Sequence, residues 1–173
     1  MNYLVLKIGE TPVAIEGDKV FEVVPAKNLR PANIGNLAGF VPWRGKQVPV
    51  VDPASLGFAD ARVELVAIVQ AHGSHMGFPG SSAVGVISVE EDSMEKPPPG
   101  LPAWVKGVHK ETWVAEPELV MRPADTARAL AENLLEFLEF CAGVLAAQED
   151  PALQKAKNLI QQYIKEKQRE KEN

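Results

Sequence analysis

A short apolar segment, residues 37–56, constrains the fold of this chain more than any other feature. Gly39 and an Arg-Gly turn lead into a run of three valines, and the run ends at Asp52-Pro53. Valine-rich residues between a glycine turn and Asp-Pro are typical of a buried strand with a tight turn before it. The segment therefore predicts β structure.

A fainter copy of this segment lies at residues 104–120. Gly107 takes the place of Gly39, and Glu116 takes that of Asp52, each acidic residue being followed by proline. The chain is thus predicted to contain one small β unit twice.

The similarity extends upstream, where residues 11–24 resemble residues 82–95. The apolar triplet at 13–15 corresponds to the triplet at 84–86. Each half is too short to enclose a large core, so the two units are expected to bury their apolar faces against each other. The alternative is a chance likeness between two strands rich in Val and Gly.

Taken in order, these features resemble the CheW-like domain, the coupling protein of bacterial chemotaxis arrays. The resemblance covers residues 3–122. It rests on two opening strands at 3–6 and 13–15, a V-x-E-V element, a central Gly…Arg-Gly…Pro…Asp motif and two later strands at 84–87 and 105–108. The chain departs from the family pattern at Trp43, where Leu is usual, at Pro53, where Leu is preferred, and at Glu116, where Asp closes the last strand.

The resemblance implies a mainly β fold of two pseudo-symmetric, five-stranded, Src-homology-like barrels over residues 1–123. C-terminal α-helices are expected over residues 124–173. The resemblance also implies a receptor-binding groove between the barrels, and the positions that we assign to it are Val20, Glu22, Val23, Gly39, Trp43 and Arg44.

Arg44 is the residue of this groove with the clearest physical rationale. A planar guanidinium on a turn can bind a carboxylate or backbone carbonyls of a partner. The alternative is a structural arginine that bridges the turn to Glu22 or Asp52. Trp43 has the same ambiguity between a core residue and an exposed contact.

Composition limits the other functions. The net charge is −5, from 18 basic and 23 acidic residues, and the Lys-rich stretch at 155–171 is interleaved with glutamates, so nucleic-acid binding is not favoured. The single Cys141 suits a reducing compartment. No stretch has the length of a membrane span. A cytoplasmic location is expected.

Residues 125–147 carry apolar positions at alternating spacings of three and four, which predicts a helix with an apolar stripe. Asp150-Pro151 is a favoured start for a second helix. The two segments could form a helical hairpin or one kinked helix. The stripe could cover the β domain, bind a partner or form a homodimer, and the residues proposed for its interface are Leu130, Leu134, Phe137 and Val144.

A search for catalytic residues gives no candidate. His72 and His75 lie in a Gly/Ser-rich stretch that predicts a flexible hairpin loop, without nearby metal ligands. No nucleophile elbow or phosphate-binding loop is present. We therefore expect no enzyme activity, no cofactor and no metal.

The function implied by the resemblance is a non-catalytic adaptor that couples the helical tip of a chemoreceptor to the regulatory domain of a chemotaxis-type histidine kinase. Two alternatives stay open. One is a small β-barrel module that binds a ligand or nucleic acid, since such barrels host either. The other is an assembly protein that dimerises through its helical tail.

Overall fold

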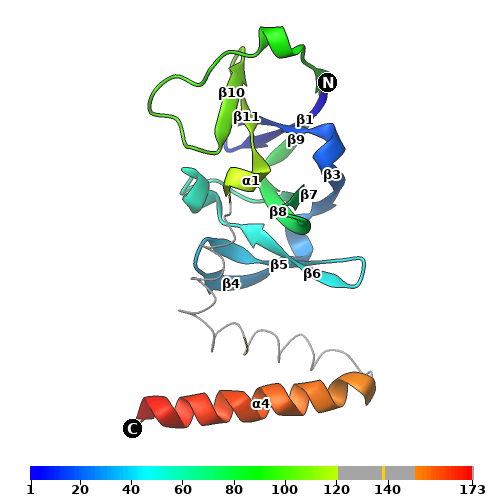
Figure 1. Ribbon diagram of the computed structural model, residues 1–173, viewed down its shortest axis with the longest axis vertical. Coiled ribbons are helices and arrows are strands. Elements are labelled where there is room, and N and C mark those ends of the chain that lie inside the picture. Colours follow the sequence, from blue (N-terminus) through cyan, green and yellow to red (C-terminus); the bar gives the residue numbers. More distant parts are fainter. Residues whose placement is uncertain (121–137, 139–150, 173) are drawn as a thin grey trace.

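The computed structural model describes residues 1–120, residue 138 and residues 151–172 (Figure 1). Its strands are β1 (Asn2–Ile8), β2 (Thr11–Glu16), β3 (Val20–Pro25), β4 (Arg30–Ile34), β5 (Leu37–Trp43), β6 (Lys46–Val51), β7 (Leu65–Ala71), β8 (Ser74–Gly80), β9 (Ser82–Ser88), β10 (Val105–His109) and β11 (Thr112–Ala115). Its helical segments are η1 (Gly17–Lys19), η2 (Ala26–Asn28), η3 (Pro53–Leu56), η4 (Glu91–Ser93), α1 (Pro117–Val120) and α4 (Pro151–Glu172).

The strands form two sheets. Sheet A has five strands in the order β10-β11-β2-β1-β9, and sheet B has six in the order β3-β7-β8-β6-β5-β4. The predicted mainly β fold is confirmed. Sheet B has one strand more than expected, because the short strand β4 adds to β5 at its edge.

The two sheets repeat one topology. In each, a hairpin (β1–β2 or β7–β8) pairs on one side with an edge strand (β9 or β3). On the other side it pairs in parallel with a second hairpin (β10–β11 or β5–β6). A short helix follows each second hairpin, α1 in sheet A and η3 in sheet B.

The downstream similarity seen in the sequence reflects this repeat. Val50 pairs with Gly39 in sheet B, and Val114 pairs with Gly107 in sheet A. The correspondence of Gly39 with Gly107 is therefore confirmed, since both glycines lie opposite the same position of the second hairpin.

The upstream correspondence is wrong. Residues 13–15 lie in β2, in the middle of sheet A, and are fully buried. Residues 84–86 lie in β9, at the edge of sheet A, and are exposed. The counterpart of β9 is β3, because both are edge strands that pair with the first hairpin through a β-bulge. Short apolar triplets in the sequence do not distinguish a central strand from an edge strand.

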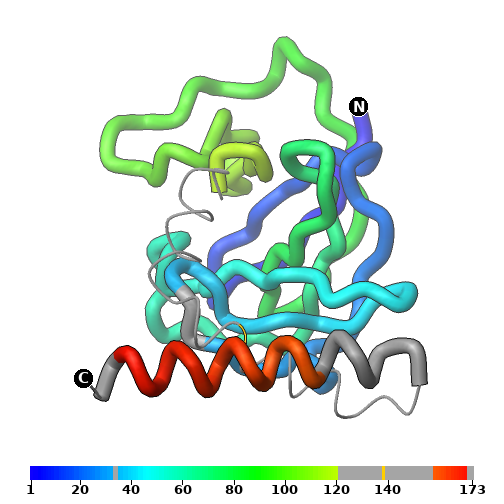
Figure 2. The backbone as a smooth tube through the Cα atoms, turned by 60° about the horizontal axis from the view of Figure 1, so that its bottom comes forward, coloured from blue at the N-terminus to red at the C-terminus, as the bar shows by residue number. Residues whose placement is uncertain are grey.

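The repeat does not divide the chain into a first and a second half. Sheet B is built from the middle of the chain, whereas sheet A combines the N-terminal hairpin β1–β2 with strands β9–β11. Figure 2 shows the blue N-terminal strand next to the green segment that follows β8. The first and last parts of the β domain therefore fold together.

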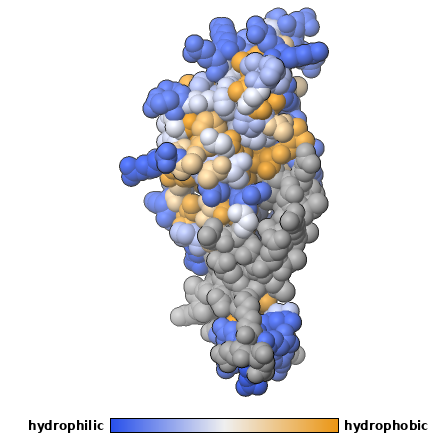
Figure 3. Space-filling model, turned by 90° about the vertical axis from the view of Figure 1, so that its left-hand side faces the viewer, coloured by the Kyte–Doolittle hydropathy of each residue, from blue (hydrophilic) through white to orange (hydrophobic). Residues whose placement is uncertain are grey.

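Each sheet curls around a small core, and a larger core lies between the sheets. Val41, Val48 and Ile68 belong to the core of sheet B, whereas Tyr3 and Val114 belong to that of sheet A. The shared core includes Leu6, Ile8, Val13, Ile15, Val51, Val69, Phe78 and Trp104. The expectation that the two units bury apolar faces against each other is thus confirmed. On the face shown in Figure 3, apolar side chains gather in the middle of the body, below a hydrophilic upper end.

The stretch around His75 differs from the predicted flexible loop. Only His72 and Gly73 form the turn, with positive φ angles of 51° and 72°, and the following residues form the buried strand β8. A Cβ atom on Gly77 would lie 2.7 Å from Val66 Cγ1. Gly77 and Gly80 therefore allow close packing inside the sheet, whereas Gly73 forms the turn.

The second C-terminal helix is present as α4 and begins at Pro151, as the Asp-Pro signal predicts. The first predicted helix, and the interface residues Leu130, Leu134, Phe137 and Val144, lie outside the described residues. The domain boundary at residue 123 also lies there and stays a prediction.

Candidate partner-binding site

Arg44 lies at the tip of the hairpin formed by β5 and β6. The pair Trp43–Lys46 closes a two-residue turn, in which Arg44 and Gly45 have φ angles of 47° and 75°. Two consecutive positive φ values are typical of the tight turn that matches the twist of a hairpin. Figure 1 shows this tip projecting beyond sheet B. The turn therefore presents the arginine away from the core.

Trp43 supports this arginine from below. The Arg44 guanidinium carbon lies 4.6 Å from the centroid of the Trp43 ring, a cation–π geometry. The indole Nε1 donates a 2.7 Å hydrogen bond to Glu22 Oε2 on β3. Because Trp43 is only 6% exposed, it fixes Arg44 and contributes little contact surface of its own.

Phe21 and His75 complete an aromatic cluster with Trp43. The ring centroids of Phe21 and Trp43 lie 5.8 Å apart, and His75 lies 4.9 Å from each of them. These separations are typical of favourable aromatic pairs. Phe21 is 44% exposed. The cluster joins β3, β5 and β8 and offers an apolar surface beside Arg44.

The structure does not support the alternative role of Arg44 as an internal bridge. The Glu22 carboxylate accepts the indole hydrogen bond, and Asp52 Oδ1 accepts a 3.0 Å hydrogen bond from the Ala54 amide at the start of η3. Within the part of the chain that the structure describes, Arg44 forms no ion pair. Its planar N–H groups are therefore available to a partner carboxylate.

The other predicted groove residues are placed differently. Val23 is 38% exposed on β3, and Val20 packs against the shared core at the start of that strand. A Cβ atom on Gly39 would lie 2.0 Å from the Arg30 carbonyl oxygen, so this glycine is needed for the pairing of β4 with β5. Glu22, Trp43 and Arg44 come together, whereas Gly39 lies four residues away along β5.

Sequence reasoning missed Phe21 and His75. Phe21 stands inside the V-x-E-V element, at the variable position, and His75 belongs to the stretch predicted as a loop. Their contact depends on β3 and β8 meeting Trp43, which no local pattern reveals.

A second group of charged side chains joins the ends of the β domain. Lys19 Nζ lies 2.8 Å from Glu116 Oε1 and 3.8 Å from Glu16 Oε2. Lys106 pairs with both glutamates, at 3.7 Å from Glu116 Oε2. We call these four residues the ion cluster. Its alternating charges lie between β2, η1, β10 and the end of β11.

The pKa values of the ion cluster follow from this geometry. Burial opposes the charge on Glu116, but the hydrogen bond from Lys19 and the charges of Lys19 and Lys106 outweigh it, so the pKa of Glu116 is lowered. Burial likewise opposes the charge on Lys19, but the Glu116 hydrogen bond and nearby carboxylates raise its pKa. Both groups are held in their charged forms, as in a structural ion pair.

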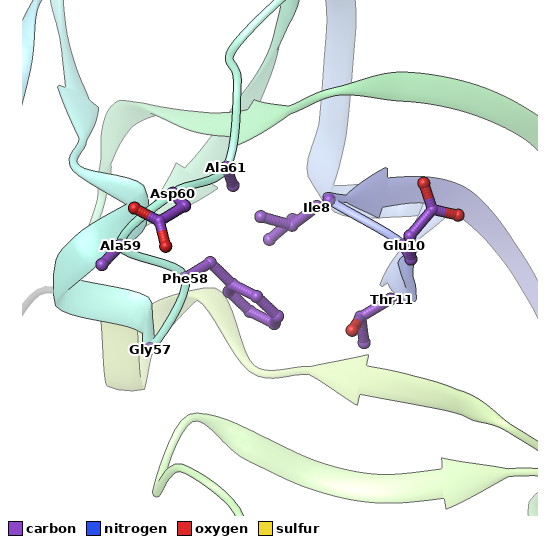
Figure 4. A pocket seen from close by; sticks show the side chains of 9 residues that line it. Ile8, Glu10, Thr11, Gly57, Phe58, Ala59, Asp60 and Ala61 are labelled. Carbon is purple, nitrogen blue, oxygen red and sulfur yellow. The ribbon is translucent and has the colours of Figure 1, made fainter.

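An open cleft of about 330 Å³ lies between the β1–β2 turn and the loop after η3 (Figure 4). Ile8 and Phe58 supply its large apolar side chains, and Glu10 and Asp60 supply its carboxylates. Thr11 supplies the one side-chain hydroxyl of the cleft lining. Among the described residues, no group of three or more His, Cys, Asp or Glu side chains is arranged to hold a metal ion.

Within the described ranges, no helix combines the length and the apolar content that a bilayer crossing requires.

Comparison with known proteins assigns this architecture to a family. Two small curled sheets around a shared core define a double-barrel β domain. The family model of the CheW-like domain matches residues 2–128. The chain therefore belongs to the CheW-like family.

A solved structure agrees with this fold. The chain is similar to the scaffolding protein TtCheW from Thermoanaerobacter tengcongensis, with 24% sequence identity and a TM-score of 0.61. The match covers 70% of this chain and 92% of that protein. Comparison with the curated proteins gives no match.

Proposed function

We propose that the protein is a non-catalytic adaptor of bacterial chemotaxis-type signalling, which couples chemoreceptors to a histidine kinase in the cytoplasm. The observation that carries the proposal is the match of the CheW-like family over residues 2–128. The described residues are consistent with a binding role, since the ion cluster, their main group of polar side chains, forms structural ion pairs. The partners are the cytoplasmic helical tip of a receptor and the regulatory domain of the kinase.

Arg44 is the centre of the proposed receptor site. A helical receptor tip exposes carboxylates and apolar side chains along its surface. Arg44 would bind a carboxylate of the tip through its planar fork, and Phe21 and Val23 would cover neighbouring apolar side chains. Because the Trp43 ring holds the guanidinium in place before binding, less side-chain entropy is lost on association.

An adaptor of this kind acts by geometry. Two modest interfaces on one rigid body raise the effective concentration of each partner near the other. The shared core between the sheets, which includes Phe78 and Trp104, provides that rigidity. Binding of a receptor on one side can then bias the kinase on the other without any chemical step.

The substitution Arg44→Ala tests the site. We expect it to weaken binding of a chemoreceptor tip from the same organism by at least tenfold, about 1.4 kcal/mol, in isothermal titration calorimetry. Thermal unfolding should stay close to wild type, since the side chain is exposed. Arg44→Lys should restore only part of the affinity, because lysine lacks the planar fork.

Arg62→Ala is the matched control. Arg62 is also exposed, but it forms a surface ion pair with Glu64 away from the hairpin tip, so its loss should not affect receptor binding. Equal affinities of Arg44→Ala and wild type would remove Arg44 from the site. A large loss of thermal stability in Arg44→Ala would make the residue structural.

A further inference from the structure

The two sheets end in edge strands that differ in how they are protected. An edge strand exposes unpaired backbone N–H and C=O groups, and proteins usually prevent pairing there with charged residues or proline. Three of the four edges follow this rule. Strand β3 has Glu22 and Pro25, β4 has Arg30 and Pro31, and β10 has Lys106 and His109.

Strand β9 is the exception. Its seven residues, Ser82–Ser88, include no charged residue and no proline. It pairs with β1 on one side, and within the described residues no strand pairs with its other side. Val86 is 68% exposed and Val84 is 56% exposed, which makes Val86 the most exposed large apolar side chain that the structure describes.

The counterpart strand β3 shows that this difference is local. Both strands carry a β-bulge against the first hairpin, at Phe21 in β3 and at Val84 in β9. The bulges place Val86 in register with Val23, and Gly85 with Glu22. Where β3 has Glu22, whose carboxylate accepts the Trp43 indole hydrogen bond, β9 has a glycine, with nothing within 4 Å of an added Cβ atom.

The sequence of β9 is nearly the same read in either direction. It reads Ser-Ala-Val-Gly-Val-Ile-Ser, with Gly85 at its centre. In an antiparallel pair of two identical strands about a twofold axis, residues at equal distances from the centre lie opposite each other. An axis at Gly85 would place Val84 opposite Val86 of the second copy, and serine opposite serine at both ends.

We propose that β9 pairs with β9 of a second copy of this chain, antiparallel and with the twofold axis at Gly85. The pairing joins sheet A of the two copies into one continuous sheet and covers Val84 and Val86 with each other. It gives hydrogen-bond partners to the unpaired backbone groups of the edge and removes the exposed valines from water. The interface is small, so the dimer is weak and depends on concentration.

This proposal goes beyond the adaptor function and does not depend on it. It differs from a dimer through the C-terminal tail, because the surface lies within the β domain. Each dimer would carry two Arg44 sites.

Sedimentation velocity of the full chain, from about 1 to about 200 µM, tests the proposal. Wild type should change from monomer to dimer with concentration. Val86→Lys should stay monomeric, since lysine protects an edge strand. Val23→Lys, at the equivalent position of β3, should dimerise like wild type. Thermal melts of both variants should show an intact fold, because both side chains are exposed.

Cross-linking tests the register. In a background with Cys141→Ser, we mix Val84→Cys with Val86→Cys under mild oxidation. Opposed residues bring their Cβ atoms close to disulfide range, so the mixture should form disulfide-linked dimers far more than either variant alone. A monomeric wild type over the whole range, a dimer that Val86→Lys leaves unchanged, or no preferential cross-link in the mixture would each overturn the proposal.

Discussion

The position of Arg44 depends on one residue next to it in the sequence and on one residue from another strand. Gly45 follows it in sequence and allows the tight turn, whereas Glu22 lies on another strand and holds the indole on which the guanidinium rests. The placement of the Arg44 guanidinium therefore depends on the placement of the Trp43 ring below it. In the proposed receptor site, Glu22 would therefore position Arg44 through Trp43 rather than contact the partner.

The ion cluster shows how single residues connect the two ends of the β domain. Lys19 follows β2 near the start of the chain, and Glu116 follows β11 near the end of the domain. Their charges are partly buried, so each depends on the other for compensation. This dependence makes the stability of the domain sensitive to pH.

Glu116→Gln should change the pH dependence of the free energy of unfolding. Because the folded state lowers the pKa of Glu116, the carboxylate stabilises the fold above its ordinary pKa of 4.5, and this contribution is lost as the pH falls through the lowered value. The raised pKa of Lys19 acts in the opposite direction: its contribution is complete below 10.5 and is lost as the pH rises through the raised value. Both contributions are therefore present near neutral pH.

Urea unfolding at a series of pH values measures this effect. We expect Glu116→Gln to be less stable than wild type by about 0.5–1 kcal/mol near neutral pH, with a difference that shrinks below pH 4.5. Glu111→Gln, in the exposed turn between β10 and β11, is the control. A Glu116→Gln difference that stayed constant down to acidic pH would contradict this role.

At the scale of elements, the sequence was informative where a pattern reflects local geometry. The structure contains the predicted Arg-Gly turn, where Arg44 and Gly45 have positive φ angles. It also contains the valine strand, which ends where Pro53 begins η3. Both features depend on the conformations of the residues that form them. The correspondence of Gly39 with Gly107 was also correct, since the two glycines lie opposite equivalent valines of the second hairpins. The opening strands were also found, since alternating apolar residues mark a strand wherever it pairs.

The sequence was not informative where the outcome depends on pairing partners. It did not reveal that β9 corresponds to β3, because burial of a strand is set by its neighbours in the sheet. It predicted a loop around His75, because a glycine that packs closely against a neighbouring strand, such as Gly77 against Val66, resembles a glycine that gives flexibility. The aromatic cluster was missed on the same grounds.

Gly39→Ala tests the contact between β4 and β5. An added methyl group would meet the Arg30 carbonyl at 2.0 Å, and a backbone atom cannot move aside without disturbing the strand pair. We expect a loss of about 3 kcal/mol or more in the free energy of unfolding. Chemical denaturation followed by circular dichroism measures it.

Gly45→Ala is the matched control for this substitution. Gly45 has a positive φ of 75°, but an added Cβ atom would meet nothing within 4 Å. Its loss should therefore cost only the conformational strain, about 1–2 kcal/mol. Equal effects of the two substitutions would show that space at Gly39 is unimportant.

At the scale of the whole molecule, the two barrels are not independent domains. The N-terminal hairpin completes the sheet formed by β9–β11, and a shared core joins that sheet to the one built from the middle of the chain. This arrangement makes the β domain one continuous unit. The proposed receptor site at the hairpin tip and the proposed pairing edge of β9 belong to different sheets, so the two proposals are compatible.

The measurement that tests the adaptor function most directly is the bridging of two partners. A labelled regulatory domain of a chemotaxis-type histidine kinase and the helical tip of a chemoreceptor, both from the same organism as this protein, are sedimented together with and without the protein. We expect the kinase domain to co-sediment with the receptor tip only when the protein is present. With Arg44→Ala, the kinase domain should still bind the protein but no longer follow the receptor. Failure of the wild-type protein to bind the kinase domain, or to join it to the receptor tip, would contradict the account.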